Sequence, residues 1–142
     1  MPTHTGNRPI APIVVDPTNK PYFDAAREGR LLIGLCRDTG RHFFYPRGCS
    51  PFTMSPNVEY VEAKGTGTIY SCTVMRTKEP YCVAYVELDE GPRVFTNIVD
   101  CDLDTVRIGQ RVRVVFKPIP GDGPPATMFA PNAFRMPRQR SP

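Results

Sequence analysis

Two cysteines in the first half of the chain have the spacing of metal-binding turns but only half of the ligands. Cys36 and Cys49 each open a short turn, where a zinc ribbon places the first thiolate of a C-x-x-C pair. Three residues further on stand Thr39 and Phe52. Structural zinc takes four nitrogen or sulfur ligands, which a hydroxyl and a benzyl group cannot replace. The stretch 30–54 therefore has the outline of a zinc ribbon with an incomplete metal site.

The sequence leaves three states open for this cysteine pair. His42 could complete a metal site through a ring nitrogen, although its spacing from Cys36 lies outside that of a normal zinc knuckle. A disulfide between Cys36 and Cys49 would require the two turns to close on each other. In the third state both thiols are free, and Phe52 and its aromatic neighbours supply apolar bulk in place of the metal. We predict the third state and expect no zinc and no other cofactor.

The remaining polar residues do not form a recognisable catalytic set. The chain has two histidines, His4 near the N-terminus and His42, and no Ser-His-Asp arrangement. Catalysis by a cysteine nucleophile needs a base beside the thiol, and only His42 could supply one. The acidic residues of the second half lie at predicted strand ends, where carboxylates commonly turn or cap the backbone: Glu87, Asp89, Glu90, Asp100, Asp102 and Asp104. We predict that the chain is not an enzyme.

A short helix and a hairpin must position the two turns. The helix is predicted over 21–29, because it begins with a proline and ends with a glycine. Tyr22, Phe23 and Ala26 share one apolar face. A helix of this length is marginal alone, so its apolar face must pack on something, and we predict these three residues as partner contacts. The hairpin strands are predicted at 31–35 and 42–45.

The rest of the chain reads as strands separated by turn residues. Gly65 and Gly67 indicate a bend, and not a phosphate loop, because their spacing is too short and a strand follows. These features predict a five-stranded Greek-key barrel of the OB-fold type, with an SH3-like barrel as the alternative. The fold class is mostly β: a short N-terminal helix and a rubredoxin-like ribbon hairpin, then the barrel. The runs rich in β-branched and aromatic residues are 58–63, 68–76, 81–88, 94–99, 111–116 and 127–130.

Composition and charge fit this order of modules. We place an extended arm at 1–18, the helix and degenerate ribbon at 19–56, the barrel at 57–131 and a disordered basic tail at 132–142. The net charge of +4 is concentrated in the three arginines of the tail. The barrel half is slightly acidic, which argues against a nucleic-acid-binding face.

Location is also predicted from composition. No apolar run approaches the ~20 residues that span a bilayer, and the N-terminus lacks the pattern of a secretory signal. The five cysteines do not resemble a disulfide framework, and Cys72 and Cys82 lie in apolar runs as core residues do. We predict a cytoplasmic protein that does not enter membranes.

Several separate strings, spread over roughly residues 20–130, carry a resemblance to a known family. In order they are A-A-R-E-G-R, L-L-I, F-Y-P-R, G-x-G-T-I-Y-S-x-T-V, V-A-Y-V-E-L-D-E-G-P-R, T-N-I-V-D-C and V-R-I-G-Q-R-V-R-V-V-F. With these strings the chain resembles the small bacterial and archaeal proteins that combine a rubredoxin-like zinc ribbon with an OB-fold. That family was long filed as a domain of unknown function and is linked to acyl-CoA metabolism.

The resemblance implies a role. Such proteins are usually non-catalytic accessory subunits of thiolase-like or ketoacyl-synthase-like enzymes, including steroid side-chain retro-aldolases, and can help bind or channel acyl-CoA. A stand-alone acyl-CoA-binding module is the first alternative, and a single-stranded nucleic-acid-binding OB-fold is the second. This sequence departs from the family at Thr39 and Phe52, where most members have cysteine, and in a short segment at 77–80.

A local excess of arginine accompanies the helix and the ribbon. Guanidinium groups suit bidentate contacts with phosphate, so Arg27, Arg41 and Arg47 are the predicted contacts for the phosphates of CoA. The alternative is an ordinary solvated surface. Arg47 is the first to test, because Pro46 and Gly48 fix its turn.

Overall fold

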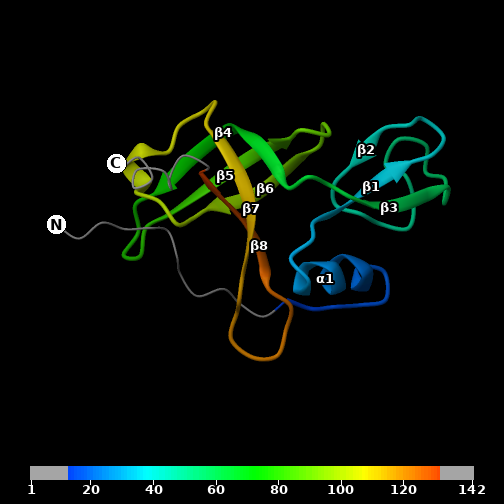
Figure 1. Cartoon of the computed structure of the whole chain (residues 1–142), viewed down its shortest axis with the longest axis horizontal. Helices are drawn as coiled ribbons and strands as arrows, with labels where there is room; N and C mark the ends of the chain where they lie inside the picture. The colour runs from blue at the N-terminus through cyan, green and yellow to red at the C-terminus, as the bar shows by residue number, and fades with distance from the viewer. Residues whose placement is uncertain (1–12, 132–142) are drawn as a thin grey trace, which may run out of the picture.

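The chain folds into a small ribbon sheet beside a closed barrel, with one helix against both (Figure 1). The computed structural model describes residues 13–131, so the predicted tail and all but the end of the predicted arm lie outside the described residues. None of the helices in residues 13–131 is long and apolar enough to cross a membrane. The elements are α1 (Lys20–Arg27), β1 (Leu32–Cys36), β2 (His42–Phe43), β3 (Val58–Glu62), β4 (Thr66–Met75), β5 (Tyr81–Leu88), β6 (Arg93–Ile98), the 3-10 turn η1 (Leu103–Thr105), β7 (Arg111–Lys117) and β8 (Ala126–Pro131).

The strand pairing confirms the predicted fold class. Strands β4, β5, β6, β8 and β7 close a five-stranded barrel, in which β6 and β8 pair parallel and the other neighbours pair antiparallel. This non-sequential order makes the barrel a Greek key, consistent with an OB-fold. Strands β2, β1 and β3 form a separate antiparallel sheet. In Figure 1 the ribbon sheet and the barrel lie at opposite ends of the molecule.

We predicted that the barrel begins at residue 57, but strand β3 belongs to the ribbon sheet. It pairs with β1 along its whole length, from Leu32 opposite Glu62 to Cys36 opposite Val58. The bend at the two glycines then separates β3 from the barrel. Gly67 is required there, because a Cβ at this position would lie 2.5 Å from the carbonyl oxygen of Glu87.

The apolar face of α1 packs into the chain's own core. The solvent-exposed fractions are 1% for Tyr22, 5% for Phe23 and 2% for Ala26. The Tyr22 hydroxyl lies 2.6 Å from the Thr127 hydroxyl on β8, and burial raises the pKa of Tyr22. The ring of Tyr22 also meets that of Phe44 in the ribbon, with centroids 5.8 Å apart. One side chain therefore connects the helix, the ribbon and the barrel.

A carboxylate–guanidinium pair links three parts of the barrel, and it makes stability depend on pH. Arg111 on β7 donates to both carboxylate oxygens of Asp89, at 2.8 and 3.0 Å, and Thr66 on β4 also donates to Asp89. These hydrogen bonds, that of Arg111 first, lower the pKa of Asp89 from 3.8 to about 2. The folded state therefore favours the ionised form. The stabilisation is present above pH ~4 and is lost as the pH falls through about 2.

Replacing Asp89 with asparagine is expected to destabilise the protein at pH 7, and the destabilisation should become small as the pH falls to about 2. The expected loss is only ~1 kcal/mol, because the pair is partly exposed and solvent screens it. Urea unfolding of both proteins from pH 2 to pH 7 measures the difference. A difference that stays constant over this range would show that the charge on Asp89 is not its source.

Candidate functional site

The first ribbon turn keeps its backbone geometry without a second thiolate. Cys36 is fully buried, its amide donates to the Arg41 carbonyl at 2.8 Å, and the Gly40 amide donates to the Cys36 carbonyl at 2.8 Å. Burial raises the pKa of the Cys36 thiol, but hydrogen bonds from the side chains of Ser50 and Thr39 and from nearby amides together lower it to about 7. Hydrogen-bond donors therefore surround the sulfur where a ribbon would place a metal.

The second turn is built around Ser50, which the sequence analysis did not single out. Ser50 is fully buried, and its hydroxyl oxygen accepts from the amides of Phe52 and Thr53 at 3.0 and 3.2 Å. A serine commonly supplies this local hydrogen bonding in a turn. The sequence S-P-F-T could therefore have identified Ser50 as the residue that stabilises the second turn. The hydroxyl holds the turn from within, as a metal ligand does in a complete ribbon.

Phe52 is part of an aromatic cluster and not of a metal site. Its ring meets Phe43 edge-on at 6.2 Å, and the guanidinium of Arg41 lies 3.9 Å from its centroid. All five cysteines of the chain are free thiols, Cys49 being half-buried. Within residues 13–131, no three His, Cys, Asp or Glu side chains group closely enough to hold a metal ion. The residues present do not fit structural zinc.

Metal analysis tests whether the ribbon holds zinc. We expect the purified protein to contain well under one zinc per chain, and EDTA to leave its thermal unfolding midpoint unchanged. A true zinc ribbon depends on its metal for folding, so a chelator would unfold it. One equivalent of zinc per chain by mass spectrometry, with unfolding in EDTA, would contradict this expectation.

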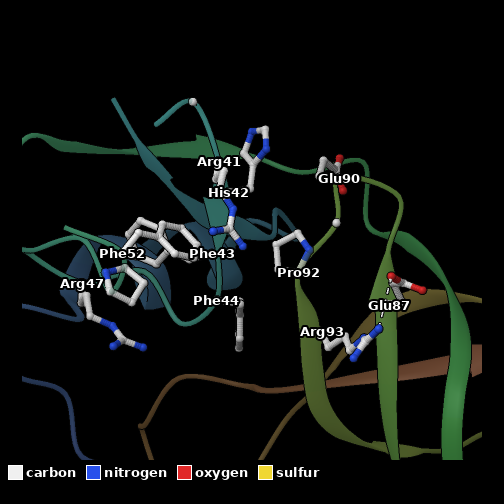
Figure 2. A pocket seen from close by; sticks show the side chains of 13 residues that line it. Arg41, His42, Phe43, Phe44, Arg47, Phe52, Glu87, Glu90, Pro92 and Arg93 are labelled. Atoms are coloured by element: carbon white, nitrogen blue, oxygen red, sulfur yellow. Dashed lines mark ion pairs between the residues drawn. The ribbon is translucent and has the colours of Figure 1, made fainter. Parts of the chain in front are cut away.

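A hollow on the surface lies between the ribbon and the barrel. Figure 2 shows side chains of the ribbon along one wall and those of the β5–β6 turn along the other. This groove has a volume of about 650 Å³ and is open to solvent. Its lining residues are Gly40, Arg41, His42, Phe43, Phe44, Arg47, Pro51, Phe52, Glu87, Glu90, Gly91, Pro92 and Arg93.

Three guanidinium groups border this groove. Arg41 lies over Phe52, and Arg47 lies 5.9 Å from the ring centroid of Phe43. Arg93 comes from the barrel side and is 3.9 Å from a carboxylate oxygen of Glu87. Among the residues that the structure describes, neither Arg41 nor Arg47 pairs with a carboxylate. The ribbon wall therefore presents two cations that an anionic ligand could approach.

Glu90 adds an unsatisfied acceptor to the same groove. One of its carboxylate oxygens accepts from the Lys64 amide at 2.8 Å, which fixes the β5–β6 turn against the segment between β3 and β4. The other oxygen, Oε1, is buried and has no hydrogen-bond partner in the described part of the chain. A buried acceptor without a donor costs free energy, and because this oxygen is shielded from solvent it is not available to a molecule in the groove in this conformation.

The structure brings together two of the three arginines predicted for phosphate. Arg41 and Arg47 line the groove, whereas Arg27 does not and instead donates to the Asp122 carbonyl at 3.1 Å. Arg93 and Glu90 were not predicted as groove residues, although both lie in the E-L-D-E-G-P-R string of the resemblance. The helix residues predicted as partner contacts are buried inside the chain, so we place the partner contact elsewhere.

Comparison with known proteins identifies both modules. Residues 23–51 match the ChsH2 rubredoxin-like zinc ribbon domain, and residues 60–117 match the ChsH2 C-terminal OB-fold domain. A DUF35 domain-containing scaffold protein of Methanothermobacter thermautotrophicus is 38% identical over 96 residues, 62% of this chain and 72% of that protein. A probable enoyl-CoA hydratase alpha subunit of Thermomonospora curvata is 40% identical over 99 residues, 64% of this chain but only 30% of that protein.

A solved structure agrees with these relatives. The chain resembles one described as an Ltp2-ChsH2(DUF35) aldolase, with a TM-score of 0.71 and 32% sequence identity. The match covers 84% of this chain and 98% of that chain. A single match to the solved structure therefore covers the ribbon and the barrel together.

Proposed function

Because this chain belongs to the DUF35 family of ChsH2-type ribbon and OB-fold proteins, we propose that it is a non-catalytic accessory subunit of a thiolase-like acyl-CoA enzyme in the cytoplasm. The observation that carries this proposal is the structural likeness to an Ltp2-ChsH2 aldolase over 98% of the matched chain. The names of the relatives, a scaffold protein and an enoyl-CoA hydratase subunit, point to the same class of role.

The placement of the polar residues supports a non-catalytic role. Asp102 caps η1 by accepting from the Asp104 amide at 3.0 Å. Asp100 binds Lys117, whose Nζ lies 2.7 Å from its carboxylate. These carboxylates stabilise turns and strand ends, whereas acid–base catalysis requires a pair held across a cleft with separated pKa values.

We further propose that the groove contributes to binding an acyl-CoA. The guanidiniums of Arg41 and Arg47, which pair with no carboxylate within residues 13–131, suit the phosphates of CoA. The groove is open and shallow for a ligand of that length, so we expect the enzyme partner to supply the rest of the site.

Association with an enzyme is the direct test of the role. Co-expression of the chain with a thiolase-like enzyme from the same organism, followed by affinity capture and gel filtration, is expected to yield a stable complex. A control capture with an unrelated enzyme of similar charge should recover nothing. If the chain elutes as a monomer and never associates with such an enzyme, it is not an accessory subunit.

A further inference from the structure

The outer surface of β4, β5 and β6 is apolar, although it faces solvent. Four of the nine large hydrophobic side chains that are exposed within residues 13–131 gather here: Tyr70, Met75, Tyr85 and Phe95. Phe95 has the highest exposed fraction of the four, 62%. A contiguous group of exposed apolar side chains on one face of a sheet commonly marks a contact surface. We call the group Tyr70, Ser71, Thr73, Met75, Tyr81, Val83, Tyr85, Phe95 and Asn97 the aromatic face.

The pairing register explains why these residues share one side of the sheet. Tyr85 lies opposite Phe95 on β6 and opposite Ser71 on β4, and the rings of Tyr85 and Phe95 are 5.1 Å apart. The alternate residues of β5 and β6 are buried in the barrel, as for Ala84 and Val94. Tyr70 joins the face because the register shifts between Ile69 and Ser71, as in a β-bulge.

No member of the aromatic face carries a charge, and charged side chains lie at both of its ends. At one end Arg93 lies over the ring of Tyr70, 3.7 Å from its centroid, and pairs with Glu87. At the other end Arg76 pairs with Asp104 at 3.0 Å. An uncharged aromatic centre with a charged rim is the usual composition of a protein–protein interface.

The same face is hollowed on both sides of Phe95. One hollow, of about 420 Å³, lies along β6 and β8 and is lined by Phe95, Thr96 and Met128 among others. The other, of about 200 Å³, lies along β4 and β5 and includes Cys72 and Tyr85. Shallow hollows beside a protruding aromatic ring suit the side chains of a protein surface, where pockets commonly hold the residues that contribute most to affinity.

Charge distribution argues against a polyanion as the occupant. Residues 13–131 carry as many basic as acidic side chains, and the single guanidinium bordering Tyr70 is paired with a carboxylate. Single-stranded nucleic acid and anionic lipid surfaces require unneutralised positive charge beside the aromatic residues. The uncharged face instead complements an uncharged surface of a protein.

The position of the aromatic face beside the groove indicates which protein binds it. Arg93 borders the aromatic face through Tyr70 and also lines the ribbon–barrel groove. A protein docked on this face would therefore lie next to the groove and could complete it. We propose that the aromatic face is the docking surface for the enzyme partner, an inference that rests on the accessory-subunit function.

Charge substitution on the face tests this inference. Because central aromatic residues dominate interface affinity, the Tyr85→Asp/Phe95→Asp variant should bind the captured thiolase-like enzyme at least ~30-fold more weakly. The control is Ile108→Asp, which places one such charge on an apolar residue that is 66% exposed outside the face. It should bind like the unmodified chain. Thermal unfolding of all three proteins verifies that they fold.

The outcomes separate this inference from the function on which it rests. If the unmodified chain and the double variant bind the enzyme equally, the docking surface is wrong while the accessory role stands. If neither binds, both proposals fail. A photo-crosslinking residue at position 95 should attach to the enzyme. A dimer of this chain that the double variant abolishes, or binding of poly-dT at physiological salt, would assign the face to another occupant and overturn the inference.

Discussion

Replacing Tyr22 with alanine is expected to lower the free energy of unfolding by about 3–5 kcal/mol, the usual cost of removing a large buried aromatic ring. The side chain is 1% exposed, and its hydroxyl and ring contact the barrel, the ribbon and its own helix. Helix α1 has only 8 residues, so it cannot hold its conformation without this contact. Urea unfolding monitored by circular dichroism measures the loss.

The Tyr22→Phe variant separates packing from hydrogen bonding. It keeps the ring and loses only the contact with the Thr127 hydroxyl, so its cost should be ~1 kcal/mol. If the alanine variant cost no more than the phenylalanine variant, the helix would not depend on this ring for docking. The position of α1 against β8 would then need another explanation.

Reversing two charges in the groove is expected to weaken binding of an acyl-CoA to the enzyme complex by ~100-fold. Each charge-assisted hydrogen bond contributes ~1.5–3 kcal/mol, and 1.4 kcal/mol corresponds to tenfold in affinity, so the loss of two is large. The variant is Arg41→Glu/Arg47→Glu, and isothermal titration calorimetry of the complex with acetyl-CoA measures the effect. Higher ionic strength should reduce binding by the unmodified complex as well.

Arg27→Glu is the matched control for this prediction. Arg27 is also exposed, but it belongs to α1, does not line the groove and contacts the Asp122 carbonyl. Binding should change by less than about threefold, since only a distant, screened charge is altered. Equal losses in Arg27→Glu and in the double variant would mean that the effect is general repulsion and that the groove does not hold the phosphates.

The strands and their order could be predicted because alternation and turn residues are local signals. The run 111–116 alternates charged and apolar residues and is strand β7, while the glycines at 65 and 67 mark the entry to the barrel. The run 81–88 carried less information. It is apolar on both sides, so the sequence could not indicate that Tyr85 faces solvent while Ala84 and Val86 are buried.

The groove could not be predicted because it is formed by residues far apart in the sequence. Arg41 and Arg47 lie in the ribbon, and Glu90 and Arg93 lie in the barrel. Only the packing of the ribbon against the barrel brings them together. The same limit applies to α1, since the pattern of Tyr22 and its neighbours predicts an apolar face but not whether the chain's own core or a partner covers it.

The ribbon illustrates how sequence and structure complement each other. The absence of two cysteines predicted a degenerate metal site. The structure adds what stands in its place: the Ser50 hydroxyl within one turn, hydrogen bonds around the Cys36 sulfur, and Phe52 turned into an aromatic cluster. These contacts give the ribbon a means of holding its shape without four thiolates.

The dependence of an enzyme's turnover on this chain tests the account most directly. Acyl-CoA turnover should be measured with the thiolase-like enzyme alone, with this chain alone, and with the two combined at equal concentration. We expect no turnover by this chain alone and at least a tenfold higher rate for the combination than for the enzyme alone. Turnover by this chain alone, or an enzyme whose rate and stability are unchanged when the chain is added, would contradict it.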